Sequence, residues 1–407
     1  MPFFNYTIRD QSGATRSGKA EAENAEVLRK RLQEEGFQVI EISMDRAAPR
    51  VPAGGYGRVR LSDLAIFARQ FSTMLDAGVS LVRCLDVLQQ QTSNARLRRI
   101  LMDLSTRVES GESLSRAMSR HPKAFSQLII GLIRAGEVGG VLEESLQRIA
   151  LFLEKDVELR RKIRSALTYP VIVLLAATGI VIFLVSWLVP QFASLFRDLG
   201  IKELPAPTQF LVDLSGFITQ KWYIIIISVV AILIAYKLFV STRVGRRVAD
   251  RVKLRVPVFG KLHHKIVMAR FSRTMGTLLA SGVPILQAME TVAGVVGNAI
   301  VADAVLESRA RIREGEKIAD PLQKSKMFPP MVVHMVSVGE ESGSLDHMLN
   351  KIADFYENEV ETAIASLTAA IEPVMIVILG FIVGFIVISM FLPMIEVISN
   401  LSQSGGE

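Results

Sequence analysis

The chain has 407 residues, of which 50% are hydrophobic and 21% are charged, and its mean hydropathy is +0.35. It is too apolar for an ordinary soluble protein and too charged for one wholly inside a bilayer, so we expect membrane spans together with water-facing domains. The net charge of +7 comes from Lys and Arg spread through helical patterns rather than grouped with aromatic residues, which favours a membrane surface over nucleic acid as a partner.

Residues 1–60 are expected to form a small α/β element followed by a linker. The alternation that begins at Phe3 and again at Gln38 is typical of strands, whereas the segment from Ala25 has a helical pattern. A Pro- and Gly-containing linker is expected from Ala47 to Gly57. The chain begins with charged and polar residues instead of an apolar run, so we expect no signal peptide and a cytoplasmic N-terminus.

Residues 61–165 carry apolar residues at helical spacing and are expected to form a cytoplasmic bundle of six short helices. Glycine is common at helix C-termini, so helix ends are predicted at Gly78, Gly111 and Gly136. The sixth helix has no breaker before Pro170. We therefore expect it to run into the membrane, with Pro170 either kinking it or marking where it enters.

Three apolar runs are long enough to cross a bilayer, since a span needs about 20 residues. They are residues 166–190, 222–241 and 370–395. Residues 191–221 are expected to be an extracytoplasmic loop, and residues 396–407 an extracytoplasmic tail. Three spans place the two termini on opposite sides of the membrane.

Basic residues flank the spans unevenly. They are Lys155, Arg160, Arg161, Lys162 and Arg164 before the first span, and Arg243, Arg246, Arg247, Arg251, Lys253 and Arg255 after the second. Cytoplasmic flanks are enriched in Lys and Arg, so residues 1–165 and 242–369 are predicted to be cytoplasmic. Nearly all of the water-facing mass would then lie in the cytoplasm.

The chain contains an internal repeat. The segment 67–79, with Phe67 and Gly78, recurs as 271–283, with Phe271 and Gly282. Further matches pair Gly136, Glu137, Gly140 and Pro170 with Gly339, Glu340, Gly343 and Pro373. The predicted fold class is therefore an all-α membrane protein with two homologous six-helix cytoplasmic bundles, residues 61–165 and 242–369, three transmembrane helices and a small N-terminal α/β element. Both bundles feed a span in the same direction, and the second span returns the chain between them.

Four motifs in this order carry a resemblance to a known family. They are AGEVGG at 135–140, LLASGVPIL at 278–286, GEESGSL at 339–345 and EPVMIVILG at 372–380. Together with the repeat, they make the chain similar to the type II secretion F family, which includes inner-membrane platform proteins of type IV pili and type II secretion systems.

The resemblance covers essentially the whole chain and implies a location and a set of partners. The location is the bacterial inner membrane. The implied partners are a hexameric cytoplasmic assembly ATPase, pilin or pseudopilin subunits, other inner-membrane assembly proteins and further copies of the chain, as a homodimer or higher oligomer. It does not tell a pilus from a secretion machine, nor which bundle meets the ATPase.

Several residues are candidates for binding a partner. The paired turns supply Gly136, Glu137, Gly140, Gly339, Glu340 and Gly343. For the two glutamates, a carboxylate that favours the start of the next helix is the preferred interpretation, ahead of partner contact. The basic segment supplies Arg246, Arg247 and Arg251, which suit either an acidic ATPase surface or anionic lipid.

Four further residues belong to the membrane region. Glu372, beside Pro373 where span three enters the membrane, could meet a pilin amine, although a hydrated carboxylate among headgroups is favoured. Gly380 and Gly384 form a small-xxx-small spacing that lets helices approach closely. Packing within the chain is favoured there over a seam between copies.

Other function classes have weaker support. A single cysteine, Cys84, excludes an intrachain disulfide, and we find no metal-binding Cys/His spacing, no phosphate-binding GxxxxGK[ST] motif and no HExxH motif, so neither an enzyme nor a cofactor is expected. Apart from Lys237 and Glu372 near span ends, the spans hold no Asp, Glu, Lys, Arg or His, which argues against a transporter. A membrane-tethered signalling adaptor is the alternative.

Overall fold

In the computed structural model, the described residues are 3–9, 15–21, 25–34, 37–44, 57–198 and 204–404. The chain divides into two compact units, Met1–Gly57 and Arg58–Glu407. The smaller unit contains β1 (Phe3–Arg9), β2 (Thr15–Glu21), α1 (Ala25–Glu34) and β3 (Gln38–Met44). Its sheet is antiparallel with the order β2-β1-β3. The strands expected at Phe3 and Gln38 are present, and β2 is an additional one; residues 47–56 of the expected linker lie outside the described residues.

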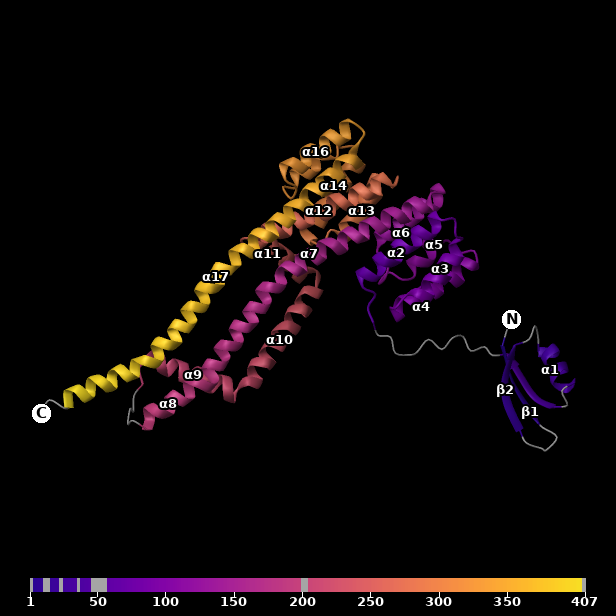
Figure 1. The fold of residues 1–407 in the computed structure, drawn as a ribbon. Coiled ribbons are helices and arrows are strands. Elements are labelled where there is room, and N and C mark those ends of the chain that lie inside the picture. The colour runs from indigo at the N-terminus through magenta and orange to yellow at the C-terminus, as the bar shows by residue number, and fades with distance from the viewer. Residues whose placement is uncertain are drawn as a thin grey trace. The chain divides into compact units, whose positions relative to one another are not determined.

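The first bundle has the six helices that the apolar spacing predicts (Figure 1). They are α2 (Leu61–Asp76), α3 (Leu81–Gln91), α4 (Ala95–Glu109), α5 (Leu114–Ser119), α6 (Gln127–Gly139) and α7 (Leu142–Phe183). Gly78 and Gly111 follow α2 and α4 with φ of +77° and +89°, as expected at helix ends. The C-cap predicted at Gly136 is wrong, since Gly136 lies inside α6 and the left-handed cap is Gly140.

The second bundle repeats this arrangement and adds one helix before it. The added helix is α11 (Arg243–Arg255), and the repeated helices are α12 (Phe259–Ala280), α13 (Ile285–Val295), α14 (Ala299–Arg313), α15 (Ala319–Lys324), α16 (Pro330–Glu341) and α17 (Leu345–Ser404). The expectation of six helices therefore holds for the repeat itself, while α11 has no counterpart among the described residues of the first bundle.

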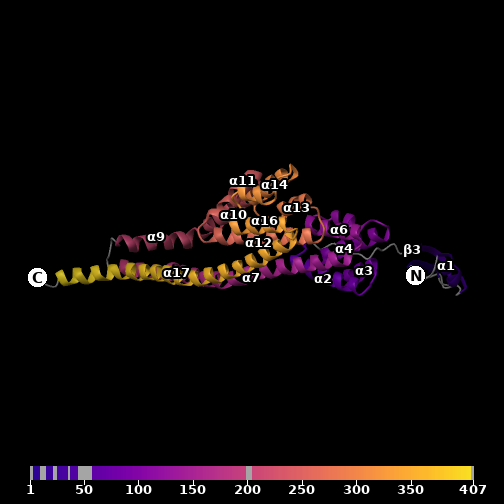
Figure 2. The same ribbon diagram turned by 90° about the horizontal axis from the view of Figure 1, so that it is seen from above.

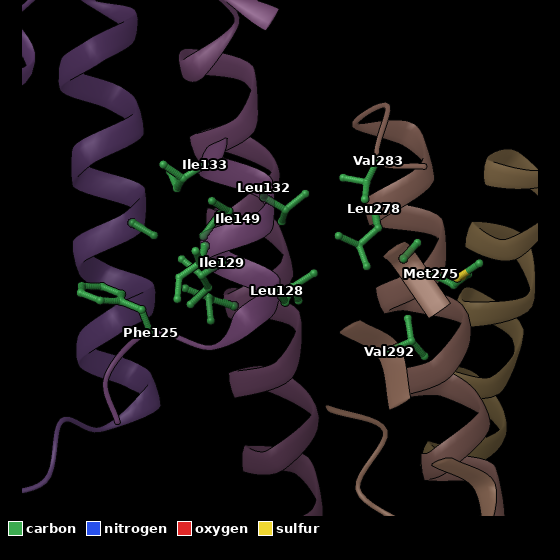
Figure 3. Packing of buried hydrophobic residues seen from close by; sticks show 14 of the residues in the cluster. Phe125, Leu128, Ile129, Leu132, Ile133, Ile149, Met275, Leu278, Val283 and Val292 are labelled. Atoms are coloured by element: carbon green, nitrogen blue, oxygen red, sulfur yellow. The ribbon is translucent and has the colours of Figure 1, made fainter. Parts of the chain in front are cut away.

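A continuous apolar core joins the two bundles. On α6, Ile129 points into the first bundle, whereas Leu128 and Leu132 point toward Leu278 and Val283 of the second (Figure 3). All five side chains are buried. Burial of apolar surface at about 25 cal/mol per Å² makes such a shared core a strong link. The two repeats therefore pack as one body.

Three helices are long and apolar enough to cross a membrane. They are Leu142–Asp198, Trp222–Ser241 and Leu345–Ile395, of which the second is α10. As expected, α7 runs from the first bundle into the membrane, with Pro170 inside the helix. The corresponding α17 does the same for the second bundle. Both views show α7 and α17 leaving the bundles in the same direction (Figures 1 and 2).

The segment 191–221, expected as a loop, is largely helical. A π-helical turn (Leu184–Leu188) leads into α8 (Val189–Asp198), and α9 (Ala206–Gln220) follows. Leu211 of α9 packs with Val185, Val189, Ile386 and Met390 in a second, smaller core. This core forms where the first and third spans end, which explains why the segment folds instead of looping. The expected tail is likewise helical as far as Ser404.

Candidate functional site

Gly136 and Gly339, predicted to bind partners, lie at close contacts between helices. A Cβ atom at Gly136 would overlap the side chain of Ser145 on α7 and lie 3.1 Å from Leu142 Cα. A Cβ atom at Gly339 would lie 2.9 Å from Leu345 Cα. Both glycines are buried. Each lets its helix pack against the beginning of the long membrane-directed helix, so the structure gives them a packing role.

Glu137 and Glu340 each cap a short helix from a distance. The Glu137 carboxylate accepts hydrogen bonds from the Ser115 amide at the start of α5, at 3.2 and 3.3 Å. The Glu340 carboxylate accepts from the amides of Ile318 and Ala319 at the start of α15, the shortest at 2.9 Å. A negative charge at a helix N-terminus is stabilising. Each glutamate therefore caps a helix, but not the helix that the sequence suggested. The capped helix lies before the glutamate in the sequence, with a separation of 22 residues between Ser115 and Glu137 and of 21 between Ala319 and Glu340.

Gly140 and Gly343 are the two members of this set that remain exposed. They adopt left-handed φ angles of +70° and +68°, which glycine adopts without steric cost. They mark the turns between α6 and α7 and between α16 and α17. Partner contact at these turns stays a prediction.

Ion pairs that repeat between the bundles were not foreseen from the sequence. Arg69 of α2 binds Glu154 of α7 at 2.7 Å, and Arg273 of α12 binds Glu357 of α17 at 2.9 Å. The two members of each pair lie more than 80 residues apart in the sequence, so no local pattern connects them. In each bundle this pair ties the first repeated helix to the helix that enters the membrane.

A second repeated charge cluster lies at the turn after α4 and α14. Glu316 accepts hydrogen bonds from Lys324 at 2.9 Å and from Arg311 at 3.3 Å, which hold the pKa of Glu316 below its ordinary value. In the first bundle, the Glu112 carboxylate accepts hydrogen bonds from Arg120 at 3.1 Å and from Arg107 at 3.3 Å. Glu112 and Glu316, which follow Gly111 and Gly315, therefore stabilise matching turns in the two bundles.

The two long helices meet near the point where they become apolar. Lys162 on α7 binds Glu361 on α17 at 2.9 Å. Further along lies a cavity of about 120 Å³ between them, lined by the membrane-edge residues Tyr169, Pro170 and Glu372 and by apolar side chains. Pro170 is buried and Glu372 and Pro373 are exposed. A carboxylate at the edge of an apolar hollow suits a cationic or amine group at the end of an apolar helix.

Gly380 and Gly384 face open space in the part of α17 that the structure describes. No atom lies within 4 Å of a Cβ position at either glycine. The packing within the chain that the sequence favoured is therefore not found among the described residues. A seam with another chain remains a prediction.

A cavity of about 470 Å³, lined by both charged and apolar side chains, lies between the bundles, and no sequence pattern predicted it. Asp156 of α7 accepts a 3.0 Å hydrogen bond from Arg160 and lies 3.8 Å from Arg270 of α12. Burial lowers the pKa of Arg270. Arg270 lies more than 100 residues from Asp156 in the sequence, so helical periodicity could not reveal their proximity. Among the described residues, no cluster of three or more His, Cys, Asp or Glu side chains could hold a metal ion.

The basic residues Arg246, Arg247 and Arg251 lie on α11 and are exposed. Arg247 binds Asp303 of α14 at 3.0 Å. The structure thus brings these three together on one helix, and separates them from the paired turns and from the membrane-edge residues. The predicted site residues form three groups and not one site.

The fold defines a class of protein: a three-span membrane protein in which a duplicated helical module feeds the membrane twice in the same direction. The family described as "Type II secretion system (T2SS), protein F" matches residues 67–190 and again 271–393. The family described as "Type II secretion system protein F, N-terminal domain" matches residues 1–43. The chain belongs to the type II secretion system protein F family.

Individual relatives match along nearly the full length. The chain is 47% identical to a type IV pilus assembly protein PilC of Thermus thermophilus, over 99% of this chain and 100% of that protein. It is 42% identical to the type IV pilus assembly protein PilC of Myxococcus xanthus, over 96% of this chain and 94% of that protein. It is 33% identical to a type II secretion system protein F of Vibrio cholerae, over 99% and 100%. The family and the layout that the sequence motifs indicate are thereby confirmed.

Proposed function

We propose that this protein is the inner-membrane platform of a type IV pilus, which transmits the motion of a cytoplasmic assembly ATPase to pilin subunits in the membrane. Membership of the F family makes the chain a multi-pass, non-enzymatic platform protein of pilus or type II secretion assembly. The pilus is favoured within this pair because the identity to the two pilus assembly proteins, 47% and 42%, exceeds the 33% to the secretion protein.

The observation that carries the mechanism is the continuity of α7 and α17. Each is a single helix that begins in a bundle and continues as a span, with lengths of 42 and 60 residues. At 1.5 Å per residue, they extend about 60 and 90 Å. No loop separates bundle from span in either repeat. A rotation or tilt imposed on a bundle would therefore reach the membrane through a stiff element.

The partner surfaces follow from the same arrangement. We expect the ATPase on the bundles, because the basic flanks of the spans favour a cytoplasmic location for them. We expect pilin near the cavity lined by Pro170 and Glu372, where an apolar helix with an amine at its end would be accommodated. The exposed turns at Gly140 and Gly343 are candidates for the ATPase contact.

A deletion strain tests the proposal. We expect loss of surface pili by electron microscopy with normal levels of secreted proteins in the same cells, and recovery of pili when the chain is supplied on a plasmid. Loss of secretion with intact pili would assign the chain to type II secretion. If neither changed, a membrane-tethered adaptor would become the better interpretation.

Association with the ATPase is a separate measurement. The full chain in detergent or nanodiscs is expected to bind the assembly ATPase in at least one nucleotide state. Absence of binding in the apo, ADP and ATP-analogue states would contradict the coupling role, even if the deletion removed pili.

A further inference from the structure

The helix α11 presents two parallel stripes of side chains to its surroundings. Valines recur every four residues at Val244, Val248 and Val252, and their exposed fractions are 72%, 44% and 54%. Arginines recur with the same period beside them. They are Arg243, Arg247, Arg251 and Arg255, and all are exposed. An apolar stripe beside a basic one is typical of a helix at a bilayer surface.

The opposite side of α11 is already occupied, which fixes the direction of the valines. Ala249 and Asp250 are buried on this side. The Asp250 carboxylate accepts a 2.9 Å hydrogen bond from the Ala299 amide at the start of α14. The Asn298 side chain donates to the Asp250 carbonyl at 3.2 Å. Because these contacts hold the helix in place, the valine stripe cannot turn inward.

The short connection between α10 and α11 places α11 next to the end of the second span. Only Thr242 separates α10 from α11, and α11 does not continue the line of α10 (Figure 1). A Cβ atom at Gly245 would overlap the carbonyl of Phe239 in the last turn of α10, so the Gly245 side of α11 meets the span. Val248 and Val252 follow Gly245 by three and seven residues and lie on the same side. Val248 and Val252 therefore lie on the side from which the span arrives.

The apolar surface continues past the end of α11. Val258 and Phe259 are 59% and 52% exposed, and Phe259 lines an apolar hollow of about 280 Å³ with Val256. Val258 holds a φ of +67°, which is strained for a β-branched residue. The turn thus keeps apolar side chains outside the core. An exposed apolar surface beside a membrane helix has to be shielded from water by lipid or by another protein.

The charge of α11 indicates what covers it. Segment 243–255 contains six basic residues and one acidic residue, and that acid, Asp250, is buried and hydrogen-bonded. We propose that α11 lies in the plane of the bilayer surface, with its valines among the lipid headgroups and with Arg243, Arg251 and Arg255 on the phosphates of anionic lipid, while Arg247 pairs with Asp303. Each cation near such a surface contributes about 1 kcal/mol. This inference depends on the three-span arrangement and not on the pilus function.

Depth-dependent quenching tests the proposal on the full chain. The buried Cys84 is replaced (Cys84→Ala), and a polarity-sensitive fluorophore is attached at Val248→Cys or Val252→Cys. The protein is placed in nanodiscs of phosphatidylcholine with or without phosphatidylglycerol, and some contain spin-labelled lipid. The matched control is Glu307→Cys, on the neighbouring helix α14, where the glutamate side chain is 70% exposed.

We expect a blue-shifted probe at both valine positions and quenching several-fold stronger than at position 307. Quenching should be stronger with phosphatidylglycerol, and this gain should be lost in the triple variant Arg243→Gln, Arg251→Gln and Arg255→Gln. Equal, water-like emission at positions 248, 252 and 307 in both bilayers would overturn the proposal. Protection of position 248 only after addition of the assembly ATPase would also overturn it, by assigning the surface to a protein.

Discussion

The two bundles repeat the same internal contacts but differ in how they begin. Both pair an arginine of the first repeated helix with a glutamate of the membrane-directed helix, and both use a glutamate to cap a short helix. In the first bundle the Asn94 side chain donates to Asp63 of α2 at 2.6 Å, whereas in the second the matching Asn298 donates to the carbonyl of Asp250 on α11.

This difference separates what the module needs from what its place in the chain requires. The repeated ion pairs and caps are needed to fold either copy. Among the described residues, a helix of this kind precedes only the second copy, which follows a span. Changes to repeated contacts should therefore act alike on the two copies, while changes to α11 should act on one.

The largest effect is expected from softening the long helices. Two glycines inserted after Ala166 of α7, or after the matching Ala369 of α17, should abolish pili although the protein remains in the membrane. Each glycine costs about 1 kcal/mol in a helix relative to alanine. Pili are counted by electron microscopy and the protein by immunoblotting of membranes.

Two inserted alanines are the matched control, because either insertion rotates the following helix by about 200° and only glycine adds flexibility. Pili that survive the alanine insertion and not the glycine insertion support a rigid coupling. Equal loss would show that helix register matters and stiffness does not. Loss at one site alone would assign the coupling to one repeat.

The next largest effect is expected at the buried glycines. Gly136→Ala and Gly339→Ala should each lower the melting temperature, since the added Cβ atom collides with α7 or α17, at a cost of about 1–3 kcal/mol. Gly131→Ala on the same α6 helix has open space around its Cβ position and should stabilise by up to about 1 kcal/mol. Thermal unfolding in detergent, followed by circular dichroism, measures both. The same sign at Gly131 and Gly136 would contradict the close-contact explanation.

A smaller effect is expected from the helix caps. Glu340→Ala should destabilise by about 1–2 kcal/mol and Glu137→Ala by somewhat less, because Glu340 serves two backbone amides and Glu137 one. Hydrogen exchange of α15 and α5 locates the loss. The control is Glu341→Ala, whose side chain is 64% exposed, and it should change stability by less than about 0.5 kcal/mol. Exchange that stays slow in α15 after Glu340→Ala would exclude the capping role.

The smallest effect is expected at the ion pair between the repeats. Lys162 and Glu361 have side chains that are 44% and 57% exposed, so Lys162→Gln should cost less than about 1 kcal/mol and even less at high salt. By contrast, Leu128→Ala removes a buried side chain from the core that joins the bundles and should cost about 2–5 kcal/mol. A larger loss for Lys162→Gln in the same unfolding assay would mean that charge, and not the apolar core, holds the repeats together.

The sequence predicted those features that depend on local periodicity or on internal comparison. The six-helix module, the three spans and the unbroken helix through Pro170 follow from apolar spacing, and the repeat follows from comparing the two halves of the chain. The helical nature of residues 206–220 was missed, because Leu211 gains its stability from Ile386 and Met390 of a distant span.

Among the site residues, a local pattern gave the right chemistry with the wrong partner. Glu137 looked like a helix cap because it follows a glycine, but Gly136 lies inside α6 and the capped amide belongs to Ser115. The contacts of Gly136 come from Ser145 on the next helix, and no spacing within α6 encodes them. A sequence pattern predicts which face of a helix a residue lies on. The distance from that residue to a side chain on another helix depends on how the helices pack.

The second span has a consequence for how this chain could have arisen. A module that crosses the membrane an odd number of times leaves the chain on the far side, so a direct tandem copy would emerge with inverted polarity. The helix α10 returns the chain to the side from which the first module entered. None of its residues is buried by the part of the chain that the structure describes. To cross the bilayer, it has to be apolar over about 20 residues. Many apolar sequences meet this requirement, so we expect the sequence of α10 to vary more among relatives than the sequences of the other two spans.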